Sequence, residues 1–191
     1  MRSSLGLVSF LLMARLATST AEAGTVVERT LAFVGRKPVL LSDVGLTRVL
    51  LKLDEAQALE RTIDETLMFE EASRLITQTP PEDVVVRAMQ GLSEKTGAGF
   101  SFHALRRKAL VQLTIANYID LRLRPQVRVE DAEVRRVFNE RVLNDPEPPP
   151  FNLVADAIRE SLEQRSLDEK VEEWVASLRR REDIRRVGAR P

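Results

Sequence analysis

Cysteine is absent from the 191 residues, and His103 is the only histidine. Without cysteine the chain has no disulfide, no thiolate nucleophile and no zinc–thiolate site. A single imidazole also excludes metal sites built from several histidines, and its place in the first turn of a predicted helix is typical of a surface residue. No glycine-rich phosphate-binding motif occurs. The sequence therefore predicts no catalytic residue, no metal site and no cofactor.

Aromatic residues are few and the charges balance. Lysine and arginine together number 29, as do aspartate and glutamate, so the formal net charge is zero. Such a balance gives no general attraction to nucleic acid or to an anionic membrane. Aromatic residues make up 5% of the chain and are not interleaved with the arginines, which argues against binding of single-stranded nucleic acid. We expect no nucleic-acid partner.

Two basic clusters remain as candidate interaction sites. Residues 106–108 (Arg-Arg-Lys) fall within a predicted helix, where we expect a solvent-facing polar side. The second cluster is denser and comprises Arg179, Arg180, Arg181, Arg185, Arg186 and Arg190. Cations near a helix C-terminus stabilise the helix dipole, which is our interpretation of the second cluster. An anionic partner or a membrane surface is the alternative.

The first 23 residues have the pattern of a secretory signal peptide. Arg2 supplies a positive start, residues 5–14 are apolar, and Ala21-Glu22-Ala23 fits the small-x-small pattern of a signal peptidase site. An apolar run of about ten residues is too short to span a bilayer, which takes roughly 20. We expect cleavage after Ala23, export to the periplasm, and no membrane span in the mature chain.

The mature sequence predicts a mainly α-helical protein that opens with a short β-hairpin. Residues 26–34 and 39–41 are rich in β-branched and apolar side chains and flank a turn at Gly35. Helices follow, in which apolar residues recur three or four positions apart. Three helix starts are marked by a residue that favours the N-cap: Ser42, Thr79 and Ser101. A further helix is predicted to start near Asp54. At Thr79 the signal is a capping box that ends at Glu82.

Four prolines within residues 145–150 mark the clearest boundary in the chain. Such a segment favours an extended, semi-rigid spacer. A short helix is predicted before it, over residues 131–142. Beyond it the spacing predicts a helix over residues 152–181, about 45 Å long at 1.5 Å per residue. We expect Trp174 to lie largely buried on its apolar face, and a final strand over residues 183–187.

Segments of this sequence resemble chaperones of the SurA family, in the same order along the chain. The hairpin followed by Ser42-Asp43-Val44 is similar to the opening of the mature family members, and residues 62–67 look like their second helix. Residues 127–134 resemble the step that precedes the family's parvulin domain. Residues 151–158 and 173–184 are similar to the family's C-terminal helix and strand.

The main departure from the family is a missing domain. In SurA-type proteins a parvulin peptidyl-prolyl isomerase domain lies between the helix that follows the step at residues 127–134 and the C-terminal helix. Here only residues 144–150 fill that interval. Glu130 also stands where the family usually has threonine. The resemblance implies a signal peptide (residues 1–23), a helical domain like the SurA N-terminal domain (24–144) and a proline-rich linker in place of the parvulin domain (145–150). Residues 151–191 would then complete the N-terminal module, with the last strand paired to the hairpin.

The function that this resemblance implies is that of a holdase, which binds unfolded outer-membrane or periplasmic polypeptides without catalysis. Methionine and aromatic side chains suit adaptable binding. The candidate lining residues are Met68, Met89, Leu92, Phe100 and Phe102. An ordinary place in the core is the alternative for each of them.

Two further functions remain open at this stage. One is that of an isomerase-family protein with residual or partner-supplied activity. The other is that of an envelope assembly partner that docks through the arginine-rich C-terminus. The sequence leaves the oligomeric state undetermined.

Overall fold

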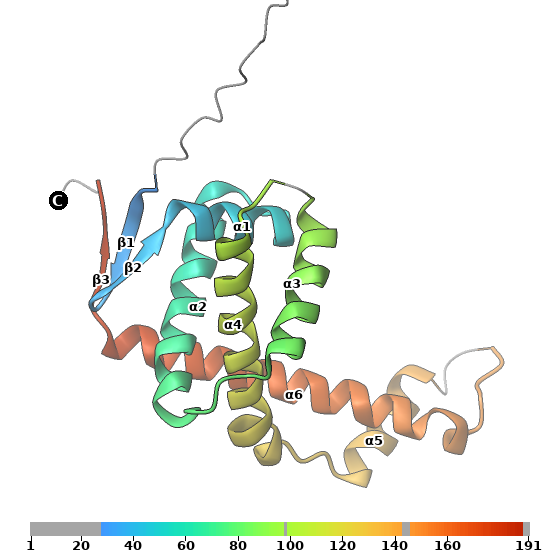
Figure 1. The fold of residues 1–191 in the computed structure, drawn as a ribbon. Helices are drawn as coiled ribbons and strands as arrows, with labels where there is room; N and C mark the ends of the chain where they lie inside the picture. Colours follow the sequence, from blue (N-terminus) through green and yellow to red (C-terminus); the bar gives the residue numbers. More distant parts are fainter. Residues whose placement is uncertain (1–27, 98, 143–145, 189–191) are drawn as a thin grey trace, which may run out of the picture.

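The computed structural model describes residues 28–97, 99–142 and 146–188, so the predicted signal peptide and its cleavage site lie outside the described residues. The fold is mainly α-helical, as predicted (Figure 1). Its elements in chain order are β1 (Thr30–Val34), β2 (Lys37–Leu40), α1 (Leu41–Leu51), α2 (Glu55–Leu75), α3 (Glu82–Thr96), α4 (Phe102–Tyr118), the π-helical turn η1 (Ile119–Leu123), the 3-10 turn η2 (Arg124–Gln126), α5 (Asp131–Val137), the π-helical turn η3 (Phe138–Val142), α6 (Phe151–Arg181) and β3 (Ile184–Arg186).

The two ends of the described chain meet in one antiparallel sheet with the strand order β2-β1-β3. Phe33 of β1 pairs with Pro38 of β2 on one side and with Arg185 of β3 on the other. Gly35 forms the hairpin turn at a φ of 56°, a conformation that costs glycine little, and its N–H donates to the carbonyl of Asp183 over 2.7 Å. The prediction that the C-terminal strand pairs with the N-terminal hairpin is confirmed.

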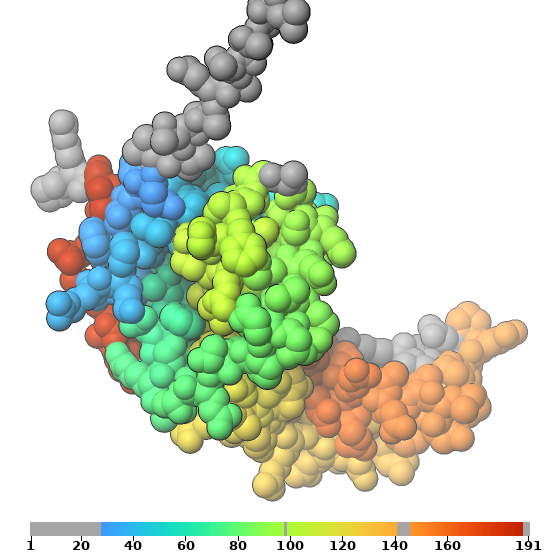
Figure 2. Space-filling model, in the orientation of Figure 1, coloured from blue at the N-terminus to red at the C-terminus, as the bar shows by residue number. Residues whose placement is uncertain are grey.

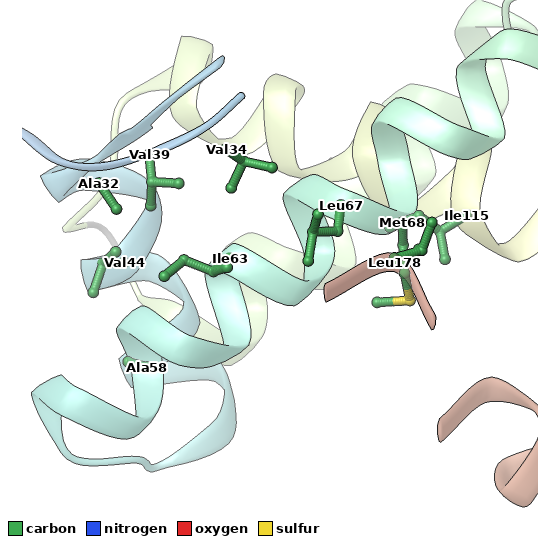
Figure 3. Close-up of a cluster of buried hydrophobic side chains, with 10 residues drawn as sticks. All are labelled: Ala32, Val34, Val39, Val44, Ala58, Ile63, Leu67, Met68, Ile115 and Leu178. Carbon is green, nitrogen blue, oxygen red and sulfur yellow. The ribbon is translucent and has the colours of Figure 1, made fainter. Parts of the chain in front are cut away.

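The main core lies between this sheet and α2 (Figure 3). Val34 and Val39 of the hairpin face Ile63 and Leu67 of α2, and all four side chains are buried. Leu178 of α6 joins the same cluster and is 2% exposed. The C-terminal helix is therefore part of the core, because its apolar face completes a cluster that the N-terminal residues begin.

Trp174 lies mostly buried, as predicted, although its burial is not complete. Its ring stacks on Tyr118, with ring centroids 4.5 Å apart and an angle of 10° between the planes, and it packs against the main core. Helix α6 packs on α2 and η1, and also on α5 and η3.

One of the three predicted helix caps, that at Ser101, is confirmed. Ser101 accepts a hydrogen bond from the Ala104 N–H. Helix α2 starts after Asp54, as predicted, and the structure adds a capping box between Asp54 and Gln57. The predicted caps at Ser42 and Thr79 are wrong. The residues that occupy the N-cap positions of α1 and α3 are Leu40 and Pro81, and neither side chain forms a capping hydrogen bond.

Helix α1 begins at Leu41 instead of after Ser42, because its cap comes from a residue earlier in the chain. The carboxylate of Glu28 accepts hydrogen bonds from the N–H and the hydroxyl of Ser42, over 3.1 and 2.7 Å. Helix α3 begins at Glu82, after Pro81. A proline disfavours helical backbone at the residue before it, so two consecutive prolines delay the start of α3 beyond Thr79.

Helix α5, the turn η3 and the first half of α6 form an arm that projects from the body of the molecule (Figure 1). We call residues 131–142 and 151–165 the α5–α6 arm. Val134 is fully buried in it, and the rings of Phe138 and Phe151 pack edge to face, 5.2 Å apart. Arg159 fastens its base by hydrogen bonds to Asp131 and to the carbonyl of Val129. The described part of the proline-rich segment, residues 146–150, lies towards the tip of the arm.

Candidate binding surfaces

The five predicted client-binding residues do not lie together on the surface. Met68 is buried in the core between the sheet and α2, whereas Met89 and Leu92 are buried between α3 and α4. Phe100 is half-buried against this second cluster. Only Phe102 is well exposed, at 62%, with its ring edge-on to that of His103.

The structure corrects the interpretation of residues 106–108 as a solvent-facing cluster. Lys108 is 5% exposed, and its ammonium group forms an ion pair with the carboxylate of Glu65. It also donates to the hydroxyl of Thr47 over 2.8 Å, and Thr62 donates to that hydroxyl in turn. This network joins α1, α2 and α4 inside the body.

A signal for the burial of Lys108 is present in the sequence. Lys108 lies four positions after Ala104 and three after Leu105, and both of these residues are buried. Residues three and four apart share one side of a helix, so the spacing places Lys108 on the inward side. Its two basic neighbours remain at the surface, where Arg106 pairs with Glu82 over 2.7 Å and Arg107 with Asp43 over 3.0 Å.

A cavity of about 280 Å³ opens beside this network, between β2, α2 and α4. We call it the β2–α2–α4 cavity. Its walls are mostly apolar and include Pro38, Leu40, Phe69 and Val111. Figure 2 shows the side of the molecule on which the blue surface of β2 and the yellow-green surface of α4 come together.

Charged residues lie at two depths around this cavity. Lys108 and Glu65 are its most buried charged residues, with 5% and 12% of their side chains exposed. Two other ion pairs in the lining are more exposed to solvent. They join Lys37 to Glu70 over 3.3 Å, and Arg107 to Asp43. The lining thus holds three cationic and three anionic side chains, which leave it without net charge.

The α5–α6 arm carries a second apolar surface. A groove of about 260 Å³ runs along it and is lined by Val137, Val154, Ala157, Ile158, Ser161, Leu162 and Arg165. Leu153, one turn before Ala157 on α6, is 72% exposed. These side chains would lose contact with water if an apolar partner covered the arm.

The C-terminal arginines bind mainly to the chain itself. Arg179 forms ion pairs with Asp64 at 2.5 Å and Glu60 at 3.0 Å, and Arg186 forms one with Glu60 at 2.7 Å. The hydrogen bond to Asp64 raises the pKa of Arg179, and burial acts to lower it. The hydrogen bond to Glu60 also raises this pKa, so the pKa of Arg179 is raised overall. Burial acts to raise the pKa of Glu60, but the hydrogen bonds from Arg186 and Arg179 outweigh it and lower that pKa. The two arginines therefore fasten α6 and β3 to α2, and Arg190 lies outside the described residues.

Among residues 28–97, 99–142 and 146–188 there is no group of three or more side chains that could hold a metal ion. In the same ranges no helix combines the length and the apolarity that a membrane span requires. Comparison with protein-family models and with curated protein sequences finds no match to this chain.

Proposed function

We propose that this chain is a periplasmic holdase, which binds unfolded exported polypeptides without catalysing a reaction on them. The observation that carries the proposal is the apolar surface of the α5–α6 arm. A groove lined by aliphatic side chains and a leucine with 72% exposure lie on an element that projects from the body. Contiguous exposed apolar surface usually marks a site of interaction, and an unfolded chain offers many apolar side chains to it.

The topology supports a relationship to the SurA family. Both ends of the described chain are fixed in one sheet, and residues 146–150, which precede α6, lie at the outer end of the arm. A domain inserted there would disturb neither the sheet nor the core. In the SurA family the parvulin domain occupies the corresponding interval of the sequence. We infer that this chain is a module of the SurA type in which the proline-rich segment replaces that domain.

The direct test is suppression of aggregation. An unfolded outer-membrane protein is diluted from urea into buffer with or without the purified chain starting at Gly24, and light scattering is followed. We expect scattering to fall as the chain approaches equimolar amounts. Leu153→Ser should weaken this effect, whereas Val187→Ser, at an exposed valine next to β3, serves as the matched control.

Two results would contradict the proposal. One is wild-type chain that leaves aggregation unchanged although it is folded. The other is acceleration of cis–trans isomerisation of a proline-containing tetrapeptide that persists at high purity and scales with the amount of protein, since a holdase has no such activity.

A further inference from the structure

We propose that the β2–α2–α4 cavity binds a tyrosine side chain of an unfolded polypeptide, with its ring between the apolar walls and its hydroxyl against Glu65 and Lys108. This inference rests on the proposed function and names a side chain that the chaperone would select. It assigns a second contact with the client, on the body instead of the arm.

The size of the cavity fits one side chain. Pockets for whole small-molecule ligands have volumes of about 300–1,000 Å³, and this cavity of about 280 Å³ lies just below that range. Its walls offer the ring of Phe69 and the aliphatic side chains of Leu40 and Val111, with Pro38 beside them. Flat aromatic rings bury a large apolar area against such walls.

The polar end of the cavity fits a group that both donates and accepts a hydrogen bond. An ammonium group has three N–H donors, and within the described residues Lys108 directs hydrogen bonds to two partners, Glu65 and Thr47. Glu65 receives that hydrogen bond on Oε2, and none of the described residues donates to its Oε1. A phenol can donate to Oε1 of Glu65 and accept from Lys108, which satisfies both groups after water has left.

The charge balance of the lining favours a neutral occupant. A carboxylate in the cavity would lie close to Glu65, and an ammonium group would lie close to Lys108, so either would meet a buried like charge. Phenylalanine would fit the walls but would leave the polar end without a hydrogen-bonding partner. Sites built to bond a hydroxyl discriminate strongly against an analogue that lacks it, because the buried polar groups then stay unpaired.

The experiment uses p-cresol, which is the tyrosine side chain cut at Cβ, and toluene, its phenylalanine counterpart. Each is titrated into the isotope-labelled chain starting at Gly24, and the amide signals of Thr66 and Val111 are followed by NMR. We expect saturable shifts with p-cresol and at least tenfold weaker binding of toluene. Equal affinities, or shifts of these two signals that do not saturate, would overturn the inference.

Two filling variants localise the binding. Val111→Phe places a ring in the cavity and should abolish p-cresol binding, whereas Ala157→Phe fills the arm groove of similar size and should not. Retained binding in Val111→Phe would contradict the site. If that variant unfolds, the contrast between p-cresol and toluene on the wild-type chain still decides the chemistry, because it needs no substitution.

The aggregation assay separates this inference from the proposed function. If the wild-type chain and Val111→Phe suppress aggregation equally well, the cavity is refuted as a client site. The proposed holdase function is then unaffected. Wild-type chain that binds p-cresol but does not suppress aggregation would refute the holdase, and with it the assignment of a client tyrosine. Weaker holding by folded Val111→Phe, together with p-cresol selectivity, supports both.

Discussion

At the scale of single residues, the buried Lys108–Glu65 pair is the least expected feature of this fold. Two charges taken out of water need close pairing and further hydrogen bonds, and the hydroxyl of Thr47 supplies one. Lys108→Ala should cost about 3–5 kcal/mol of unfolding free energy, because it leaves Glu65 buried without a partner. The double variant Lys108→Met with Glu65→Leu should recover most of that loss, since apolar residues of similar volume often replace a buried pair without cost.

Urea denaturation at neutral pH measures these differences. The matched control is Arg106→Ala on the same helix, whose ion pair with Glu82 is exposed and should contribute about 0–1 kcal/mol. A Lys108→Ala variant as stable as this control would show that the pair is unimportant for folding.

The carboxylate of Glu60 makes stability depend on acidity. Burial acts to raise its pKa, and the hydrogen bonds from Arg186 and Arg179 lower it below its ordinary value of 4.5 overall. A lowered pKa in the folded chain means that the ionised group stabilises the fold above pH 4.5, and that this contribution is lost as the pH falls through the folded pKa. We expect the melting temperature of the wild-type chain to fall over that interval more steeply than that of Glu60→Gln. Parallel melting curves of the two proteins against pH would contradict this expectation.

At the scale of elements, local sequence signals predicted what local contacts decide. The predicted cap at Ser101 uses a residue three positions away, so a short stretch of sequence contains the whole interaction. The helix start predicted near Asp54 is likewise fixed by a residue three positions away. The start of α1 could not be predicted in this way, because Glu28, which caps it, lies 14 residues before Ser42. The late start of α3 reflects two prolines whose backbone restriction overrides the preference of Thr79 for the N-cap.

Helix α6 should be essential to the fold although a proline-rich segment separates it from the other helices. A chain that ends at Pro150 loses Leu178 from the main core and leaves β1 without β3. The exposed core surface and the free strand edge should make the truncated chain aggregate. Calorimetry of the purified fragment measures this loss as the absence of a cooperative thermal transition. A normal transition would show that α6 and β3 are dispensable for the core.

At the scale of the whole molecule, residue type predicted exposure poorly and position along the helix predicted burial well. Methionine suits adaptable contacts, yet Met68 and Met89 are both buried. Met89 and Leu92 lie on the apolar side of α3, which the structure places inward. The arm carries an apolar groove and the exposed side chain of Leu153. This groove could not be located from sequence, because which part of α6 lacks a covering partner depends on where α2 and η1 end in space.

Phe102 and Phe100 offer a matched pair for the remaining predicted site, at and just before the start of α4. That end of α4 lies at the end of the body away from the arm (Figure 1). Phe102 is 62% exposed, so Phe102→Ser should change the unfolding free energy by less than about 1 kcal/mol. Phe100 is half-buried against the cluster between α3 and α4, and Phe100→Ser should cost roughly 2 kcal/mol or more. If clients contact this end of the body, Phe102→Ser should also weaken holding about fivefold, because covering a partly exposed ring contributes about 1 kcal/mol. Urea denaturation and the aggregation assay on the same two variants measure stability and client holding. A stable Phe102→Ser variant that holds clients as well as the wild-type chain would exclude Phe102 from the binding surface. The arm and the β2–α2–α4 cavity would then remain as the proposed client contacts.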